Sequence, residues 1–169
     1  DLAQRQWQIA IDKATALVAE DSSSALAWSL LAEATLHDPK LRSQSMLEKQ
    51  NRLASLTLKV ANFSDADTSS ALLARLAGEI YYWREKFNEA ALYTTRAYQQ
   101  DPSDSRNITH LARLHFSRYR PFGFHNEIEI YETALAYNPA DIDAVLGLAS
   151  THLPVSYTHL RAHETHTNL

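Results

Sequence analysis

The chain has 169 residues, of which 45% are hydrophobic and 21% charged, and its formal net charge at pH 7 is -4. It contains no cysteine, which excludes disulfides and thiolate metal sites. Only three glycines and five prolines occur, so we expect an all-α fold with few turns. The negative charge gives no reason to expect nucleic acid as a partner, and no apolar run is long enough for membrane insertion.

Three helices are predicted in the first 63 residues. Apolar side chains recur every three or four residues in the first one and so share a face: Trp7, Ala10, Ile11, Ala14, Leu17 and Val18. Serines 22 to 24 supply caps for a second helix, which Asp38-Pro39 ends near His37, because proline disfavours helix in the residue before it. A longer helix is predicted from Leu41 to Asn62, before a polar connection.

Residues 71–104 have the pattern of a helical hairpin. Two helices are predicted on either side of a short polar turn, and the small residues Gly78 and Ala90 stand where the two backbones could come close. Asp101-Pro102 ends the second helix. A similar ending returns 37 residues later at Pro139, which indicates a further unit over residues 105–141 with about three extra residues in its turn, near Arg120 to Phe124.

The hairpin resembles the tetratricopeptide repeat, a family of 34-residue helix-turn-helix units. The family's small and aromatic positions are matched at Gly78, Tyr81, Phe87, Ala90, Ala97 and Pro102. The resemblance implies antiparallel helix pairs stacked as a right-handed superhelix, an α-solenoid. It implies one domain over residues 1–153: a divergent unit at about 5–63, a regular unit at 71–104, a unit with a turn insertion at 105–141 and a truncated unit at 142–153.

In this family the first helix of each unit lines a concave groove that receives segments of partner proteins. Carried over by pattern, the groove candidates are Arg75, Glu79, Tyr82, Trp83, Arg106, Thr109, Arg113 and Phe116. Arginines beside aromatic side chains are typical interface anchors, so we expect a peptide or protein partner of acidic character. The alternative is that the arginines form ordinary pairs with Glu79 and Glu85 and that Trp83 packs inside.

No pattern predicts catalysis, so we expect a protein that is not an enzyme, with no cofactor and no metal site. A glycine-rich phosphate loop and a Gly-x-Ser-x-Gly elbow are missing. His110 and His115 are interpreted as core or surface residues, with His115 at the packing position that Tyr81 holds one unit earlier. The acid pairs at Glu127 and Asp141 lie at helix starts and are interpreted as caps.

The last residues depart from the repeat pattern at Pro154. Residues 155–165, VSYTHLRAHET, resemble a translated adapter used in transposase-based sequencing libraries, so residues 154–169 are interpreted as a non-native tail. The alternative is a histidine tail that binds metal weakly through His159, His163 and His166. If the third unit is cut short, Val145, Leu148 and Ala149 lose a covering helix, and we expect fraying or self-association at this C-terminal end.

Two classes of function remain open at this point. The first is a non-enzymatic interaction scaffold, whose architecture is similar to the C-terminal repeat regions of bacterial winged-helix transcriptional regulators and related signalling proteins. The second is a regulatory or assembly region of an enzyme with its catalytic domain elsewhere. Because residue 1 is Asp rather than Met, we interpret the chain as part of a longer protein. The compartment is undetermined, with the cytoplasm favoured and the periplasm the alternative.

Overall fold

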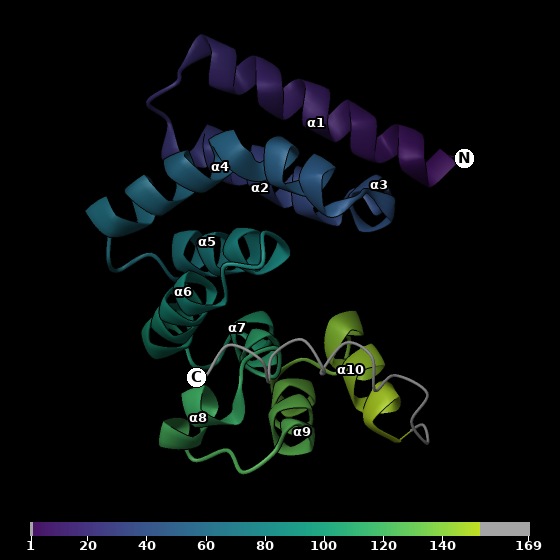
Figure 1. Cartoon of the computed structure of the whole chain (residues 1–169), viewed down its shortest axis with the longest axis vertical. Coiled ribbons are helices and arrows are strands. Elements are labelled where there is room, and N and C mark those ends of the chain that lie inside the picture. Colours follow the sequence, from purple (N-terminus) through teal and green to yellow (C-terminus); the bar gives the residue numbers. More distant parts are fainter. Residues whose placement is uncertain (1, 153–169) are drawn as a thin grey trace.

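The protein is all-helical over residues 2–152, the part that its computed structural model describes, and no strand occurs there (Figure 1). Ten α-helices and one 3₁₀ helix follow one another: α1 (Leu2–Glu20), α2 (Ala25–His37), α3 (Pro39–Ser43), α4 (Met46–Ala66), α5 (Ala71–Trp83), α6 (Phe87–Gln100), α7 (Ser105–Leu111), α8 (Phe116–Tyr119), η1 (Arg120–Phe122), α9 (Glu127–Tyr137) and α10 (Ile142–His152). None of these helices is both long and apolar enough to cross a membrane. The predicted all-α class is confirmed.

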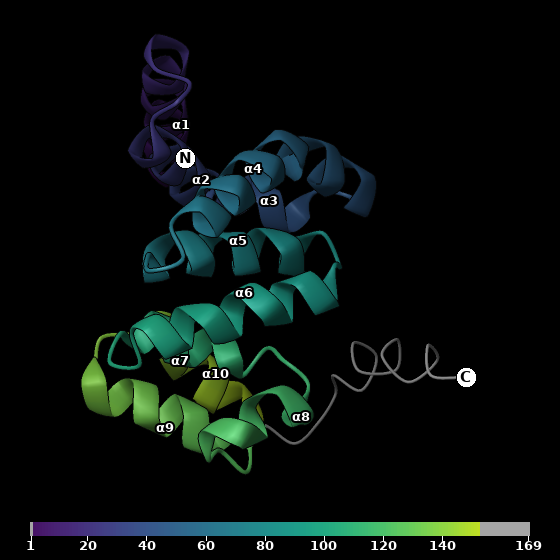
Figure 2. The same ribbon diagram turned by 90° about the vertical axis from the view of Figure 1, so that its left-hand side faces the viewer.

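The helices pack mainly with their neighbours along the chain. α5 packs against α6, α1 against α2, α4 against α5, and α9 against both α7 and α10. Contacts also skip one or two helices, since α2 touches both α4 and α5. The result is an elongated arrangement with α1 at one end and α7 to α10 at the other (Figure 2).

A four-residue turn, which we call a joint, recurs before α2, α5, α7 and α10, at residues 21–24, 67–70, 101–104 and 138–141. Asp21, Asp67 and Asp101 each accept hydrogen bonds from the amide and the hydroxyl of a serine two residues later, at 2.6 to 3.1 Å. Asn138 plays the same part with the amide of Ala140. The fourth residue of each joint caps the next helix with its own side chain. Side-chain turns of this type fix chain direction locally, which explains why the helix ends repeat.

The helix predicted from Leu41 to Asn62 is two helices in the structure. Asp38 caps α3 by accepting from the Lys40 amide, with Pro39 in the first turn where its missing N–H costs nothing. α3 then ends, and Ser45 starts α4 through a reciprocal capping box with Glu48. The capping signal at Ser45 therefore overrides the apolar periodicity that favoured one continuous helix.

Gly78 and Ala90 lie where two helix backbones meet, as predicted. A Cβ atom on Gly78 would lie 2.6 Å from Thr94 Oγ1 and 3.4 Å from the Ala90 carbonyl oxygen. Only glycine allows α5 and α6 to approach this closely. The prediction from residue size is confirmed.

Buried apolar side chains form two separate clusters. The first joins α2 to α6, from Trp28 to Tyr93. The second joins α7 to α10, from Ile108 to Ala144, with Phe122 and Phe124 of the turn insertion packed near Tyr98 of α6. Helix α6 therefore contributes one aromatic ring to each cluster.

Candidate functional site

A pocket of about 350 Å³ opens on the face where α2, α5, α7 and the start of α10 converge. We call it the inner pocket. It is lined by Leu36, His37, Arg42, Glu79, Trp83, Arg106, Arg113, Asn138, Ala140, Asp141, Ile142 and Asp143. The lining combines three arginines and three carboxylates with apolar side chains such as Leu36 and Trp83.

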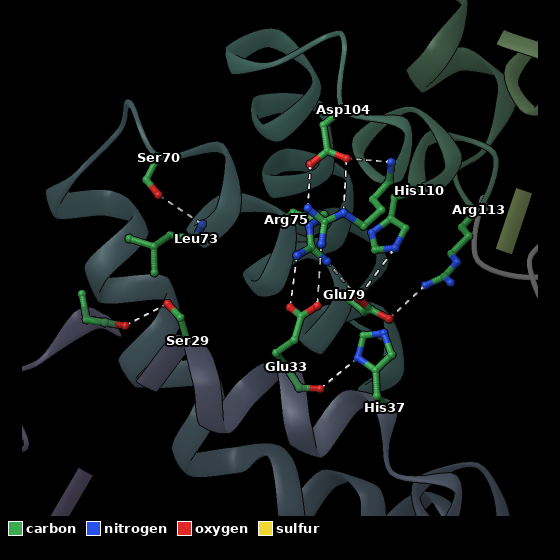
Figure 3. Close-up of polar contacts among 12 residues, drawn as sticks. Ser29, Glu33, His37, Ser70, Leu73, Arg75, Glu79, Asp104, His110 and Arg113 are labelled. Atoms are coloured by element: carbon green, nitrogen blue, oxygen red, sulfur yellow. Dashed lines mark hydrogen bonds and ion pairs between the residues drawn. The ribbon is translucent and has the colours of Figure 1, made fainter. Parts of the chain in front are cut away.

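A network of charged side chains includes Glu79 and Arg113 of the inner pocket and extends to residues that do not line it (Figure 3). Arg75 Nη2 lies 3.1 Å from Glu33 Oε2, and Arg75 Nη1 lies 4.0 Å from Glu79 Oε2. Glu79 also approaches Arg113 Nη1 at 3.4 Å and His110 Nε2 at 3.7 Å. These pairs connect α2, α5 and α7. The centre of the network is buried, so its charges orient one another rather than face solvent.

Two of the predicted groove residues lie beneath the pocket surface. Arg75 is buried against Glu33 and Glu79. Thr109 is also buried, and its hydroxyl donates to Asp141 Oδ2 at 3.3 Å. Neither side chain is available to a partner, and both hold helices together. The sequence could not show that partners on other helices bury them, Glu33 of α2 for Arg75 and Asp141 before α10 for Thr109.

Arg106 and Arg113 do line the pocket, with different freedom. Arg106 is exposed, pairs with Asp104 at 3.1 Å and lies 3.9 Å from Glu33. The hydrogen bond to Asp104 raises the pKa of Arg106, which keeps the guanidinium charged. Arg113 is held between Glu79 and Asp143, at 3.4 and 3.7 Å. Arg106 is therefore the more exposed of the two cations.

Of the aromatic candidates, only Trp83 is among the residues that line the pocket. Trp83 is half-buried, lines the pocket and also packs against the first core cluster. Tyr82 stands beside it, with ring centroids 6.4 Å apart, and the Arg113 guanidinium lies 5.7 Å from the Tyr82 ring. Part of the alternative interpretation thus agrees with the geometry, because Arg113 pairs with Glu79 and Trp83 is partly inside. Within residues 5–151, no arginine lies within ion-pair distance of Glu85.

Phe116 lies away from the other candidates. The sequence predicted one helix through this residue, but α7 ends at Leu111, where the next three amides donate to carbonyls three residues back. His115 then caps α8 and is exposed, so its predicted packing role is wrong. Phe116 starts α8, is exposed and stacks on His115 with ring centroids 4.5 Å apart. It does not line the inner pocket.

His110 is the buried histidine of the network. Burial lowers its pKa well below 6.5, and the nearby charges of Arg113, Arg75 and Arg106 lower it further. The Glu79 carboxylate opposes this shift at 3.7 Å, but three cations and desolvation outweigh one anion. His110 is therefore neutral at pH 7. It fills space between charged groups and is closed to solvent.

Several pocket residues were absent from the sequence prediction. Arg42 comes from α3, and its side chain is exposed with no ion-pair partner in the described region. Asp141 and Asp143 were interpreted as helix caps, and Asp141 does accept from the Ala144 amide at 3.0 Å. The cap prediction is confirmed for Asp141, which serves the pocket as well. Arg42 carried no periodic signal, since it lies in a helix that the sequence did not separate from α4.

Among the described residues, no group of three or more potential ligands could hold a metal ion. The tail histidines His159, His163 and His166 lie outside the described residues. No protein-family model matches the chain, and no curated protein matches it.

Proposed function

We propose that the protein is a non-enzymatic interaction module whose inner pocket binds a segment of a protein partner. In this proposal its helix pairs stack as a right-handed, tetratricopeptide-like α-solenoid. The convergence of Arg42, Arg106 and Arg113 with the apolar surfaces of Leu36 and Trp83 supports this proposal most directly. The arginines can donate paired hydrogen bonds to a carboxylate of the partner, and the apolar side chains provide surface that the partner can bury. Binding hot spots combine these two features.

The charges of the pocket refine the chemistry of the partner. The three arginines are balanced by the carboxylates of Glu79, Asp141 and Asp143. A long acidic run would therefore meet as much repulsion as attraction. One carboxylate beside an apolar side chain fits better, since Arg42 and Arg106 are exposed and can turn toward it. The apolar neighbour would rest on Trp83.

The test begins with a library of extended peptides in which one Asp or Glu adjoins a leucine or phenylalanine. Selected peptides are titrated by fluorescence anisotropy against the wild type and against Arg42→Glu combined with Arg106→Glu. We expect the double variant to lose at least about a hundredfold in affinity, because two attractive contacts become repulsive. Helical content by circular dichroism should stay unchanged, since both side chains are exposed.

The matched control is Arg118→Glu combined with Arg120→Glu, which makes the same charge change at exposed arginines outside the pocket. Its affinity should stay near that of the wild type, apart from a small long-range effect that salt removes. Equal losses in both double variants would show a non-specific charge effect and contradict the proposal. So would a library from which no peptide binds the wild type.

A further inference from the structure

Helices α2, α5, α7 and α10 begin in the same register, so their positions can be compared one by one. In each, the first helical hydrogen bond joins an amide to the carbonyl of the capping residue four positions earlier. The pairs are Trp28 to Ser24 at 3.2 Å, Ala74 to Ser70 at 3.1 Å, Ile108 to Asp104 at 3.2 Å and Val145 to Asp141 at 3.0 Å. The cap therefore provides a common origin for numbering positions along the four helices.

Helix α10 exposes the positions that the other three helices bury. Four residues after the cap, Trp28, Ala74 and Ile108 are 9%, 0% and 0% exposed, whereas Val145 is 46% exposed. One residue further, Leu146 is 58% exposed, where the equivalent residues of the other helices are buried. Ala149 is exposed at the position that Gly78 occupies in α5. We call Val145, Leu146 and Ala149 the α10 stripe.

The earlier helices indicate what normally covers these positions. Gly78, equivalent to Ala149, packs against Ala90 and Thr94 of α6, the second helix of its own pair. Thr109, equivalent to Leu146, contacts Asp141 at the start of the next first helix. The α10 stripe thus has the shape to receive two neighbours, a second helix and a following first helix. Within residues 2–152, α10 has neither.

At the opposite end of the described residues, α1 and α2 leave apolar side chains uncovered. α1 packs against α2 as α4 packs against α5 and α9 against α10, so α1 occupies the place of a second helix. An apolar groove of about 280 Å³ lies between α1 and α2 and includes Ala10, Leu17 and Leu30. Leu30, six residues after its cap, is 45% exposed, whereas Leu76 and His110 at the same position are 0% and 6% exposed. We call this the α1–α2 groove.

We infer that copies of this chain associate head to tail, with the α10 stripe of one copy seated in the α1–α2 groove of the next. In this arrangement the second copy's α1 covers Ala149, as α6 covers Gly78 in α5, and also covers the neighbouring Val145. Its α2 covers Leu146, as α10 covers Thr109. Both surfaces are apolar, and each supplies the helix that the other end lacks.

The two surfaces differ, so the contact is heterologous and repeats without closing. Figures 1 and 2 place α1 and α10 in opposite halves of the molecule. A copy can therefore use its groove and its stripe at once, and the assembly grows as a chain rather than stopping at a dimer. An α10-to-α10 dimer, in contrast, would bury the stripe and leave the groove open.

The test uses one substitution on each surface. Leu146→Glu places a charge in the α10 stripe, and Leu30→Glu places one in the α1–α2 groove; both leucines are exposed, so both variants should fold. By sedimentation velocity the wild type should form species larger than a dimer as its concentration rises. Each variant alone should stay monomeric at concentrations where the wild type associates. The apparent dissociation constant for association of one copy with the next should rise at least about tenfold.

The equimolar mixture of the two variants decides the geometry. The intact stripe of Leu30→Glu should bind the intact groove of Leu146→Glu, giving a dimer that cannot grow. Leu58→Glu, at an exposed leucine of α4 outside both surfaces, is the control and should assemble like the wild type. A monomeric wild type, a monomeric mixture, or a Leu30→Glu variant that dimerises alone would each overturn the inference. None of these outcomes depends on peptide binding in the inner pocket.

Discussion

Arg75 on α5 and Glu33 on α2 are 42 positions apart in sequence, and their side chains meet at 3.1 Å. Arg75 is buried, and Glu79 approaches its other amino group at 4.0 Å. A buried cation between two carboxylates is stable only while both signs are present, because the desolvation cost of each ion is offset by the others. The pair therefore ties the first two helix pairs together through charge as well as through apolar contact.

Replacing Arg75 with alanine should lower the free energy of unfolding by about 3 kcal/mol. The substitution leaves the buried Glu79 with fewer cations and opens space beside it. Urea unfolding followed by circular dichroism measures the effect. Arg118→Ala is the control, since Arg118 is exposed and its one described side-chain bond is to Asn88 at 3.3 Å. A loss below about 1 kcal/mol for Arg75→Ala would contradict the role of this residue.

Gly78→Ala should destabilise the protein although alanine favours helix. The new methyl would meet Thr94 Oγ1 at 2.6 Å, and overpacking of this kind costs about 1 to 3 kcal/mol, against a gain of about 1 kcal/mol in helix propensity. Adding Thr94→Ala removes the closest atom and should restore part of the loss. A double-mutant cycle by urea unfolding gives the coupling. Strictly additive effects would show that the two residues do not collide.

His110 should make stability fall in mild acid. Its pKa in the folded protein lies well below the value of about 6.5 expected in the unfolded chain. Between these two values the unfolded chain binds a proton that the folded protein does not, so stability rises with pH across this window and is lost as pH falls below about 6.5. The slope approaches about 1.4 kcal/mol per pH unit. Urea unfolding at several pH values measures it.

His110→Gln separates this effect from the titration of other groups. The variant should lose the slope below about pH 6.5 that the wild type shows, whatever its absolute stability. The exposed His115 is the control, and His115→Gln should keep the wild-type slope. A variant of His110 with an unchanged slope would mean that the acid sensitivity arises elsewhere. Protein that gains stability in acid would contradict the sign.

The sequence could predict those parts of the fold that local signals specify. Cap residues and prolines located most helix ends, and the small residue Gly78 predicted the close approach of α5 and α6. Where two local signals competed, periodicity misled. The prediction of one helix from Leu41 to Asn62 missed the break before Ser45, whose capping box starts a new helix.

The inner pocket was less predictable because it depends on what lies across from each residue. Helical periodicity placed Arg75 and Arg106 on the same kind of face, but one is buried and the other exposed. Arg75 is buried between Glu33 and Glu79, and no local pattern links it to Glu33, which lies 42 residues earlier. Phe116 was misplaced for a local reason, since α7 tightens and ends at Leu111.

The division of the core into two clusters bears on cooperativity. The first cluster involves α2 to α6 and the second α7 to α10, and charged contacts of Glu33 and Glu79 with Arg106 and Arg113 cross between them. When neighbouring modules are joined mainly at one boundary, unfolding of one need not unfold the other. Salt weakens the charged contacts more than the apolar ones. Raising the ionic strength should thus weaken the coupling between the two clusters during melting, mainly at the exposed contact of Arg106 with Glu33.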